Sequence, residues 1–305
     1  MTDMTRPEHS IETGHTVPIV GAVGRELRIC WAFSAGDLTA TVIPATTFAV
    51  AGWMSAGAVI WSLPVLLTEC LAYFWLYIYT FNLSNQLVGI DEDRLNKPHR
   101  PLVTGLVTPN GTRKRLAVTT SVFLVLGAQI GVLEWAALWV GAWLFHNHLG
   151  GARTMWGKNA AMVVGTIAQL AAAWHLATPL TATAWTWILS IALPLAVLVS
   201  LQDLRDVTGD AAVGRRTAIT VFGEYGCRRF FSAAFAIYPP LLYVVLYRDS
   251  STAALTIGTL AATLSYTISY RVIRLRTRRA DNTTYLLYTY WYCATLVSAI
   301  AACTH

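Results

Sequence analysis

Long apolar stretches separated by short polar segments run from about residue 25 to the end of the chain. A helix needs about 20 mainly apolar residues to cross the ~30 Å hydrocarbon core of a bilayer. We therefore predict an all-α fold: a polytopic membrane protein, embedded in the lipid bilayer, with about nine transmembrane helices. The expected spans are residues 27–51, 58–86, 114–133, 135–150, 158–177, 184–203, 228–247, 252–272 and 284–303.

The composition agrees with this interpretation. The 305 residues are 55% hydrophobic and only 12% charged, and this charged share is about half of the ~25% typical of soluble domains. A soluble protein of this length would need a more charged exterior, so the default class is a membrane protein. The five cysteines are scattered, without CxxC or Cys/His ligand spacing, and we expect neither disulfides nor zinc.

The placement of charge predicts an orientation. The start of the chain is polar and lacks the apolar region of a signal peptide, so we expect residues 1–24 to form a flexible cytoplasmic tail and residues 25–305 one transmembrane domain. Every Lys and Arg except Arg248 falls on one side of the predicted bundle. The positive-inside rule identifies this side as cytoplasmic, with the N-terminus inside and the C-terminus outside. The net charge of +6 needs no nucleic-acid partner.

Acidic residues gather at the predicted cytoplasmic end of the second span, in the stretch NQLVGIDEDRLNKPHRPL at residues 85–102. If the helix of that span continues through the stretch at about 100° per residue, Asn85, Glu92 and Asp93 share one face and Asp91 leaves it. Carboxylate and amide oxygens on one helix face suit Mg²⁺, which takes oxygen ligands and commonly bridges carboxylates to phosphate.

A second acidic cluster, DLRDVTGD at residues 203–210, follows the sixth span on the same side of the membrane. The same helical arithmetic places Asp203, Asp206 and Asp210 within one arc. Solvated helix ends paired with nearby arginines would be the simpler explanation of one such cluster. Two clusters on one side of the membrane favour a pair of magnesium-binding faces opposite each other.

The two acidic stretches resemble the two aspartate-rich motifs of the UbiA superfamily of intramembrane prenyltransferases, whose nine-span plan also matches. The resemblance covers nearly the whole chain from about residue 25. It implies that two magnesium-bearing motifs hold the diphosphate of an isoprenoid substrate, whose tail lies in a central chamber among the helices. By position, Asn85 and Asp93 match the ends of the first motif, and Asp203, Asp206 and Asp210 match the second.

Basic residues near the motifs are expected to bind the diphosphate, because cations neutralise phosphate oxygens. These residues are Lys97, Arg100, Lys158, Arg205 and Arg215. For each one singly, an ordinary positive-inside charge is the alternative.

The chain departs from most prenyltransferases of the superfamily at Gly89, where they carry an aspartate. Glu92 lies one helical turn further along the same face and can replace that ligand. The pattern NQ..G..EDRLNKP.RP followed by GRRT resembles the membrane-embedded terpene cyclases of fungi and actinobacteria. This branch implies a magnesium-dependent cyclase that ionises an isoprenyl diphosphate, expected to be farnesyl diphosphate, and cyclises it to a sesquiterpene. The expected catalytic residues are Glu92, Asp93, Asp203 and Asp206.

A cyclase needs a dry chamber in which aromatic faces stabilise cationic carbon. Tyr77, Asn147, Tyr266 and Trp291 are expected to line it, although packing or interfacial belting also explains such aromatics. A chamber of this kind equally suits an intramembrane prenyltransferase that moves the prenyl group to an aromatic acceptor, so this alternative stays open. A transporter is less well supported, because its site would lie at the bilayer midplane. A non-catalytic scaffold would not explain two metal-binding faces.

Overall fold

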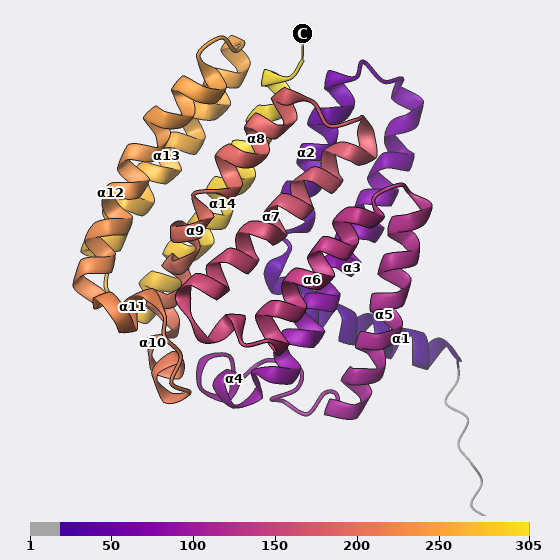
Figure 1. Cartoon of the computed structure of the whole chain (residues 1–305), viewed down its shortest axis with the longest axis vertical. Helices are drawn as coiled ribbons and strands as arrows, with labels where there is room; N and C mark the ends of the chain where they lie inside the picture. The colour runs from indigo at the N-terminus through magenta and orange to yellow at the C-terminus, as the bar shows by residue number, and fades with distance from the viewer. Residues whose placement is uncertain (1–18, 305) are drawn as a thin grey trace, which may run out of the picture.

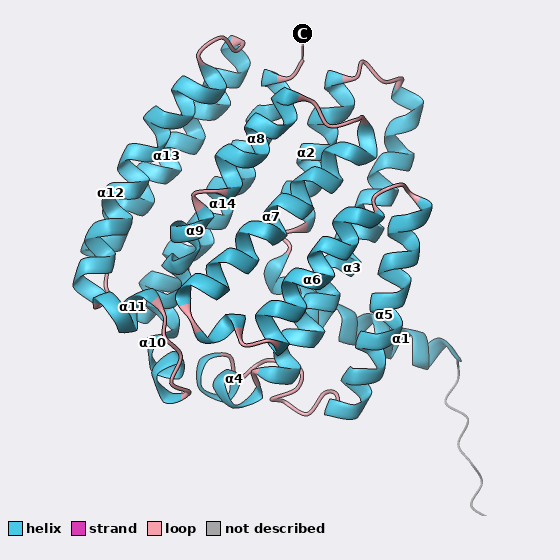
Figure 2. Ribbon diagram, viewed as in Figure 1, coloured by secondary structure: helices cyan, strands magenta, loops and turns pink. Residues whose placement is uncertain are grey.

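The computed structural model describes residues 19–304, and this part of the chain is built from helices joined by turns (Figure 2). The all-α prediction is confirmed for it. The predicted tail lies largely outside the described residues, and the first helix begins at Ile19, within the last part of that tail. The helices are α1 (Ile19–Ser34), α2 (Val42–Ser55), α3 (Leu63–Val88), α4 (Ile90–Asn96), α5 (Pro109–Gln129), α6 (Leu133–His148), α7 (Met155–Ala177), α8 (Ala182–Ala192), α9 (Leu195–Leu198), α10 (Asp203–Ala212), α11 (Ala218–Phe222), α12 (Glu224–Leu242), the π-helical turn η5 (Tyr243–Tyr247), α13 (Thr252–Arg274) and α14 (Arg278–Ala302).

The long helices lie roughly side by side along one axis (Figure 1). α2 packs against α3, α7 and α14, while α12 packs against α13 at one edge and α3 packs against α5 at the other. The short helices α4, α10 and α11 gather at one end of the bundle, and the C-terminus lies at the opposite end.

Four helical segments of the described chain are long and apolar enough to cross a membrane: Ile60–Val88, Met155–Ala177, Ala182–Ala212 and Glu224–Tyr247. The pair Gly21–Asp37 and Val42–Ser55 adds a fifth if it is counted as one span, but it bends by 74°. The count of nine spans is therefore not confirmed. The span predicted over residues 27–51 is bent rather than straight, because α1 and α2 meet at that angle.

Side chains from neighbouring helices satisfy the backbone where the first predicted span breaks, between α1 and α2. Asn82 Nδ2 of α3 donates to Phe33 O and to Asp37 Oδ2, each at 2.8 Å. Gln169 Nε2 of α7 donates to Thr41 O at 2.9 Å. Non-helical backbone is tolerated at membrane depth only where partners replace the lost helical bonds. Asn82 and Gln169 therefore stabilise the bend.

Prolines remove a helical hydrogen bond at two later points, Pro194 between α8 and α9 and Pro239 inside α12, and a hydroxyl group replaces the lost bond each time. Pro194 lacks the N–H that would bond the carbonyl four residues earlier, and Tyr238 Oη donates to that oxygen instead. Pro239 likewise frees the carbonyl of Phe235, which accepts from Ser265 Oγ at 2.7 Å. At both prolines the replacement bond is thus also a contact between two helices.

The aromatic packing between α3, α6 and α7 depends on a glycine. Tyr77 stacks on Trp139 with ring centroids 4.3 Å apart. Trp139 Nε1 donates to Tyr77 O at 2.9 Å, and Tyr77 Oη donates to Gly165 O at 2.7 Å. A Cβ atom at Gly165 would lie 2.3 Å from the Trp139 ring. The three helices approach this closely because residue 165 has no side chain.

Replacing Gly165 with alanine should lower the melting temperature of the detergent-solubilised protein, because overpacking a close-packed interior costs about 1–3 kcal/mol. Gly141→Ala is the matched control, since Gly141 lies in α6 and a Cβ atom there meets nothing within 4 Å. Thermal unfolding followed by circular dichroism compares the two variants. Equal melting temperatures would show that Trp139 moves aside at no cost.

Candidate functional site

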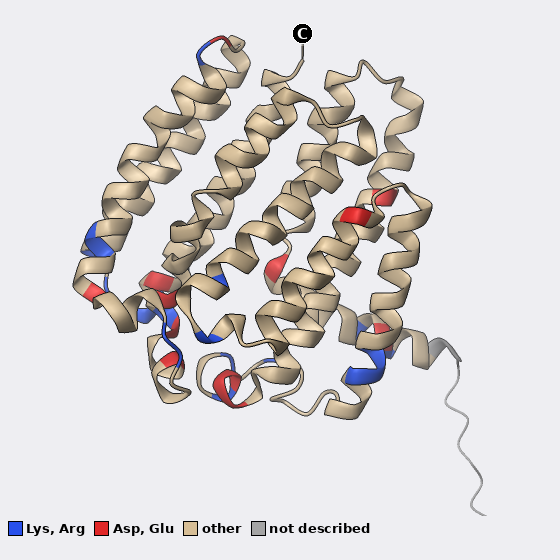
Figure 3. Ribbon diagram, in the orientation of Figure 1, with Lys and Arg blue, Asp and Glu red and all other residues tan. Residues whose placement is uncertain are grey.

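Most charged residues of the described chain lie toward the end of the bundle where α4 and α10 lie (Figure 3). α4 packs against α10, so the two acidic stretches meet although they lie far apart in the sequence. The loop between η5 and α13 holds Arg248, the exception in the predicted distribution of basic residues.

The first acidic stretch does not continue the helix of the second span. Gly89, with φ of −99° and ψ of 20°, interrupts the helix between α3 and α4, so the continuous-helix prediction is wrong. Helical bonds bracket the break, from Gly89 N to Asn85 O in the last turn of α3 and from Asp93 N to Gly89 O, each 2.9 Å. The burial of the acids nevertheless follows the predicted faces. Glu92 and Asp93 are buried, whereas the Asp91 side chain is 84% exposed.

The acids of the second stretch all lie in α10 and are buried. Asp203, Asp206 and Asp210 are 0%, 8% and 1% exposed. The Oδ2 atoms of Asp203 and Asp210 have no hydrogen-bond partner in the described chain. α10 ends just before Gly214, whose φ of +67° suits a residue without Cβ.

The basic side chains expected at the site pair with its carboxylates. Arg215 links the two stretches, because Nη2 lies 2.7 Å from Glu92 Oε2 and Nη1 lies 3.3 Å from Asp210 Oδ1. Lys158, near the start of α7, lies 2.5 Å from Asp203 Oδ1. A buried carboxylate without a partner would carry a large desolvation cost. Arg215 and Lys158 therefore offset the cost of burying these carboxylates.

Three more basic side chains pair with acids of α4 and α10. Arg100 Nη1 donates to both oxygens of Asp93, at 2.9 and 2.7 Å. Asp206 has two partners, Lys97 Nζ at 3.8 Å and Arg205 Nε at 3.6 Å. Burial lowers the pKa of Lys97, and the nearby Arg100 guanidinium lowers it further. All five predicted basic residues thus lie at the site.

Backbone pairing brings two of these cations together. The loop after α10 pairs with the segment before α7 through Arg216, whose N donates to Arg153 O at 3.0 Å and whose O accepts from Met155 N at 2.8 Å. This pairing holds the segment of Arg215 against the start of α7, which carries Lys158. One cation from each segment therefore enters the same site.

Asn96 and Gly209 form the crossing point of α4 and α10, and sequence reasoning missed both. Asn96 is buried, and its Nδ2 donates to Asp206 O at 3.2 Å. A Cβ atom at Gly209 would lie 2.2 Å from Asn96 Nδ2. α4 ends at Asn96 because Lys97 precedes Pro98, and proline disfavours helix in the residue before it. In the sequence, the sign of this crossing was Gly209, a glycine within the acidic stretch at residues 203–210.

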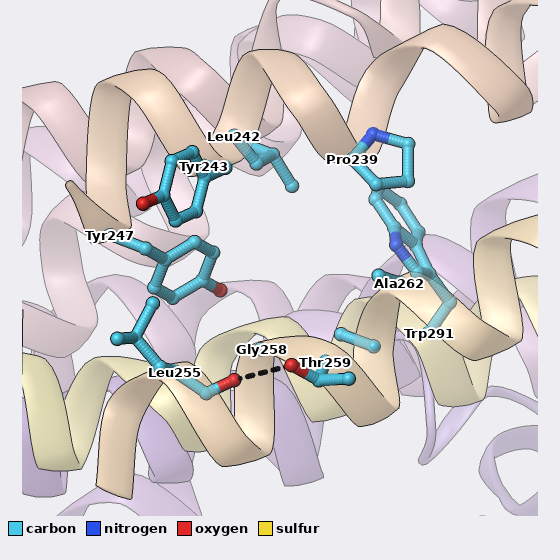
Figure 4. A pocket seen from close by; sticks show the side chains of 10 residues that line it. Pro239, Leu242, Tyr243, Tyr247, Leu255, Gly258, Thr259, Ala262 and Trp291 are labelled. Atoms are coloured by element: carbon cyan, nitrogen blue, oxygen red, sulfur yellow. Dashed lines mark hydrogen bonds between the residues drawn. The ribbon is translucent and has the colours of Figure 1, made fainter. Parts of the chain in front are cut away.

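Of the residues expected to line a chamber, Tyr77 and Trp291 are buried and Tyr266 is not. Trp291 lines a cavity of about 140 Å³ between α12 and α13 (Figure 4). Tyr266 is 48% exposed, so the prediction that it lines a chamber is wrong. Tyr270, one turn along α13, is 63% exposed as well. Tyr266 and Tyr270 therefore share the exposed face of α13.

Asn147, the fourth residue expected in the chamber, belongs to a buried polar network at the end of α6. Its Nδ2 donates to Ser84 Oγ at 3.0 Å, and its Oδ1 accepts from His146 Nδ1 at 2.7 Å. His148 Nε2 lies 2.9 Å from the same Ser84 oxygen. Because Ser84 directly precedes Asn85, this network fixes the last turn of α3 from the side of α6.

Comparison with known proteins identifies the family. The UbiA prenyltransferase family matches residues 41–294, so this chain belongs to that family, as the two motifs predicted. The chain is 39% identical to somaliensene A/B synthase of Streptomyces somaliensis, over 91% of this chain and 94% of that protein. It is 36% identical to diterpene cyclase eriG of Hericium erinaceus, over 91% and 89%. It is 34% identical to polyprenyl transferase eriF of the same fungus, over 92% and 96%.

Solved structures agree on the fold. A UbiA homolog from Archaeoglobus fulgidus, solved with DMAPP and Mg²⁺, superposes with a TM-score of 0.63 at 14% identity. The superposition covers 90% of this chain and 98% of that one. The helical bundle described above is therefore the UbiA fold.

Replacing Gly209 with alanine should push α4 away from α10, because the new Cβ atom overlaps Asn96. We expect faster amide hydrogen exchange in α4 and a loss of about 1–3 kcal/mol in stability. Thr208→Ala, at the neighbouring exposed position of α10, is the control and should leave α4 unchanged. Hydrogen-exchange mass spectrometry measures both, and unchanged protection of α4 in the Gly209 variant would contradict the crossing.

Proposed function

We propose that this chain ionises an allylic prenyl diphosphate between α4 and α10 and cyclises the hydrocarbon that remains. The observation that carries the proposal is the meeting of two buried acidic faces with five basic side chains at one end of an apolar bundle. The similarity to proteins named as a terpene synthase and a diterpene cyclase supports cyclisation. We further propose that this end of the bundle faces the cytoplasm and that the C-terminus lies outside.

The basic side chains bind the diphosphate in this proposal. Each of these cations pairs with a carboxylate, so binding of the diphosphate would exchange one negative partner of the cation for another. Charge-assisted hydrogen bonds from guanidinium and ammonium groups to phosphate oxygens are among the stronger polar contacts in proteins. The residues with this role are Lys97, Arg100, Lys158, Arg205 and Arg215.

The acidic side chains fit a magnesium site. In residues 19–304, no three His, Cys, Asp or Glu side chains form a ready-made metal cluster, because basic side chains lie between the carboxylates. The buried Oδ2 atoms of Asp203 and Asp210 nevertheless have no hydrogen-bond partner and supply the oxygen ligands that Mg²⁺ prefers. When bound there, Mg²⁺ would stabilise negative charge on the leaving diphosphate. The proposed ligands are Asn85, Glu92, Asp93, Asp203, Asp206 and Asp210.

The proposed reaction begins when the allylic C–O bond breaks and the diphosphate oxygen keeps the electron pair. The distal double bond of the same chain then attacks the carbocation, and loss of a proton forms the final double bond. Glu92, Asp93, Asp203 and Asp206 are the proposed catalytic residues, because they would hold the metal ion that binds the diphosphate. Buried aromatic rings such as that of Trp291 can each stabilise cationic carbon by roughly 0.5–2 kcal/mol.

A prenyltransferase acting on an aromatic acceptor is the second candidate, and the similarity to a protein named polyprenyl transferase favours it. Both reactions share the diphosphate site and ionisation. They differ in what captures the carbocation, so the requirement for an acceptor separates them.

Purified protein with Mg²⁺ and a prenyl diphosphate as the only organic substrate should release pyrophosphate and a cyclic hydrocarbon, detected by gas chromatography–mass spectrometry. Farnesyl diphosphate is the expected substrate, and geranylgeranyl diphosphate is the comparison that the similarity to a diterpene cyclase calls for. EDTA should stop the reaction with either. A prenylated aromatic product, with no hydrocarbon formed when the acceptor is omitted, would contradict the cyclase and support the transferase.

Glu92→Gln and Asp93→Asn should each lower turnover by roughly 10²-fold or more, a loss typical of removing one group that stabilises transition-state charge. Asp91→Asn is the matched control because its side chain is exposed and pairs only with Arg94 among the described residues. It should retain turnover within about twofold. Pyrophosphate release measures all three, and an essential Asp91 beside a dispensable Glu92 would refute the assignment.

A further inference from the structure

The first two turns of α14 meet both acidic helices of the site. Arg278, Asn282 and Tyr285 are spaced by four and three residues, which places them on one face of a helix. We call these three residues the α14 stripe. Arg278 contacts the end of α4, and the other two contact Arg205 of α10.

Two members of the α14 stripe hold Arg205. Its Nη1 donates to Asn282 Oδ1 at 2.9 Å, and its Cζ lies 4.0 Å from the centroid of the Tyr285 ring. A guanidinium over an aromatic face is attracted electrostatically, and its planar fork is already ordered for further hydrogen bonds. Arg205 Nε is buried without a hydrogen-bond partner in the described chain, 3.6 Å from Asp206 Oδ2. This donor is therefore available to an anion bound beside Asp206.

The third member fixes the other acidic helix. Arg278 Nη2 donates to Asn96 O at 2.9 Å, and Asn96 Nδ2 in turn donates to Asp206 O at 3.2 Å. A continuous series of hydrogen bonds thus runs from α14 through the end of α4 to α10. Movement of Arg278 would loosen the crossing of the two helices.

The first turn of α14, which carries Arg278, is anchored to α12. Arg228 of α12 makes a bidentate pair with Asp281, at 2.9 and 2.7 Å, and donates to Val272 O at 3.0 Å. Arg228 and Asp281 are 2% and 4% exposed. Asp281 contacts α12 while the stripe contacts α4 and α10, so the first turn of α14 joins the site to the α12–α13 edge of the bundle.

We infer that the α14 stripe positions the diphosphate site: Asn282 and Tyr285 orient Arg205 toward the anion, and Arg278 holds the end of α4 against α10. The inference rests on the proposed function, because the anion is the diphosphate group of the substrate. It holds for a cyclase and for a transferase alike, since both bind the same group.

Isothermal titration with MgCl₂ and inorganic pyrophosphate tests the stripe without requiring turnover. Tyr285→Leu removes the ring under Arg205 and should weaken pyrophosphate binding roughly fivefold, whereas Tyr285→Phe keeps the ring and should bind within about twofold of wild type. Arg278→Ala should also weaken binding several-fold. Arg279→Ala is its matched control, because Arg279 is exposed and forms no ion pair with the described residues.

A purely structural role would give a different pattern. We expect Tyr285→Leu to raise KM for the prenyl diphosphate more than it lowers kcat, and to leave farnesol binding and the melting temperature unchanged. Equal losses for pyrophosphate and farnesol, or a phenylalanine variant as weak as the leucine variant, would overturn the inference. A wild-type protein that binds pyrophosphate but forms no cyclic hydrocarbon would overturn the cyclase alone. A wild-type protein that binds no pyrophosphate would overturn both.

Discussion

Pairing of opposite charges across α4 and α10 is the interaction on which the site end of the bundle depends. Buried carboxylates on facing helices repel one another and lose hydration, and only nearby cations offset both effects. Arg215 serves both helices at once by reaching Glu92 and Asp210, and Lys158 serves the fully buried Asp203. Under the proposed function, the same pairs prepare the site for its substrate. A diphosphate takes over the cations and leaves the carboxylate oxygens to a metal ion.

A second constraint shapes the rest of the bundle, because a backbone polar group at membrane depth needs a partner inside the protein. At three places where a helix bends or loses a hydrogen bond, side chains from neighbouring helices supply the partner. Asn82 and Gln169 bond the backbone at the bend between α1 and α2, Tyr238 bonds the carbonyl freed by Pro194, and Ser265 bonds the carbonyl freed by Pro239 inside α12. The irregular backbone and the tertiary packing therefore depend on each other. These three places lie where a polar side chain of a neighbouring helix can reach the backbone.

The chemistry of the site could be predicted from the sequence better than its local backbone. Acids and bases stood out because charge is rare in so apolar a chain, and the helices follow from the length of the apolar stretches. The bend over residues 35–41 could not be predicted, because it depends on Asn82 and Gln169 far away in the sequence. Tyr266 was misplaced because helical spacing finds residues that share a face but not what that face meets. The α14 stripe likewise exists only through contacts with α4 and α10.

The most direct measurement is an experimental structure of the protein with Mn²⁺ and an unreactive thiolo-diphosphate analogue of the substrate, in which anomalous scattering locates the manganese. We predict manganese peaks between α4 and α10, in contact with oxygens of Asp203 and Asp210, and a diphosphate group bound by Arg215 and Lys158. Manganese elsewhere in the bundle, or a diphosphate lying away from both acidic helices, would contradict the proposed site.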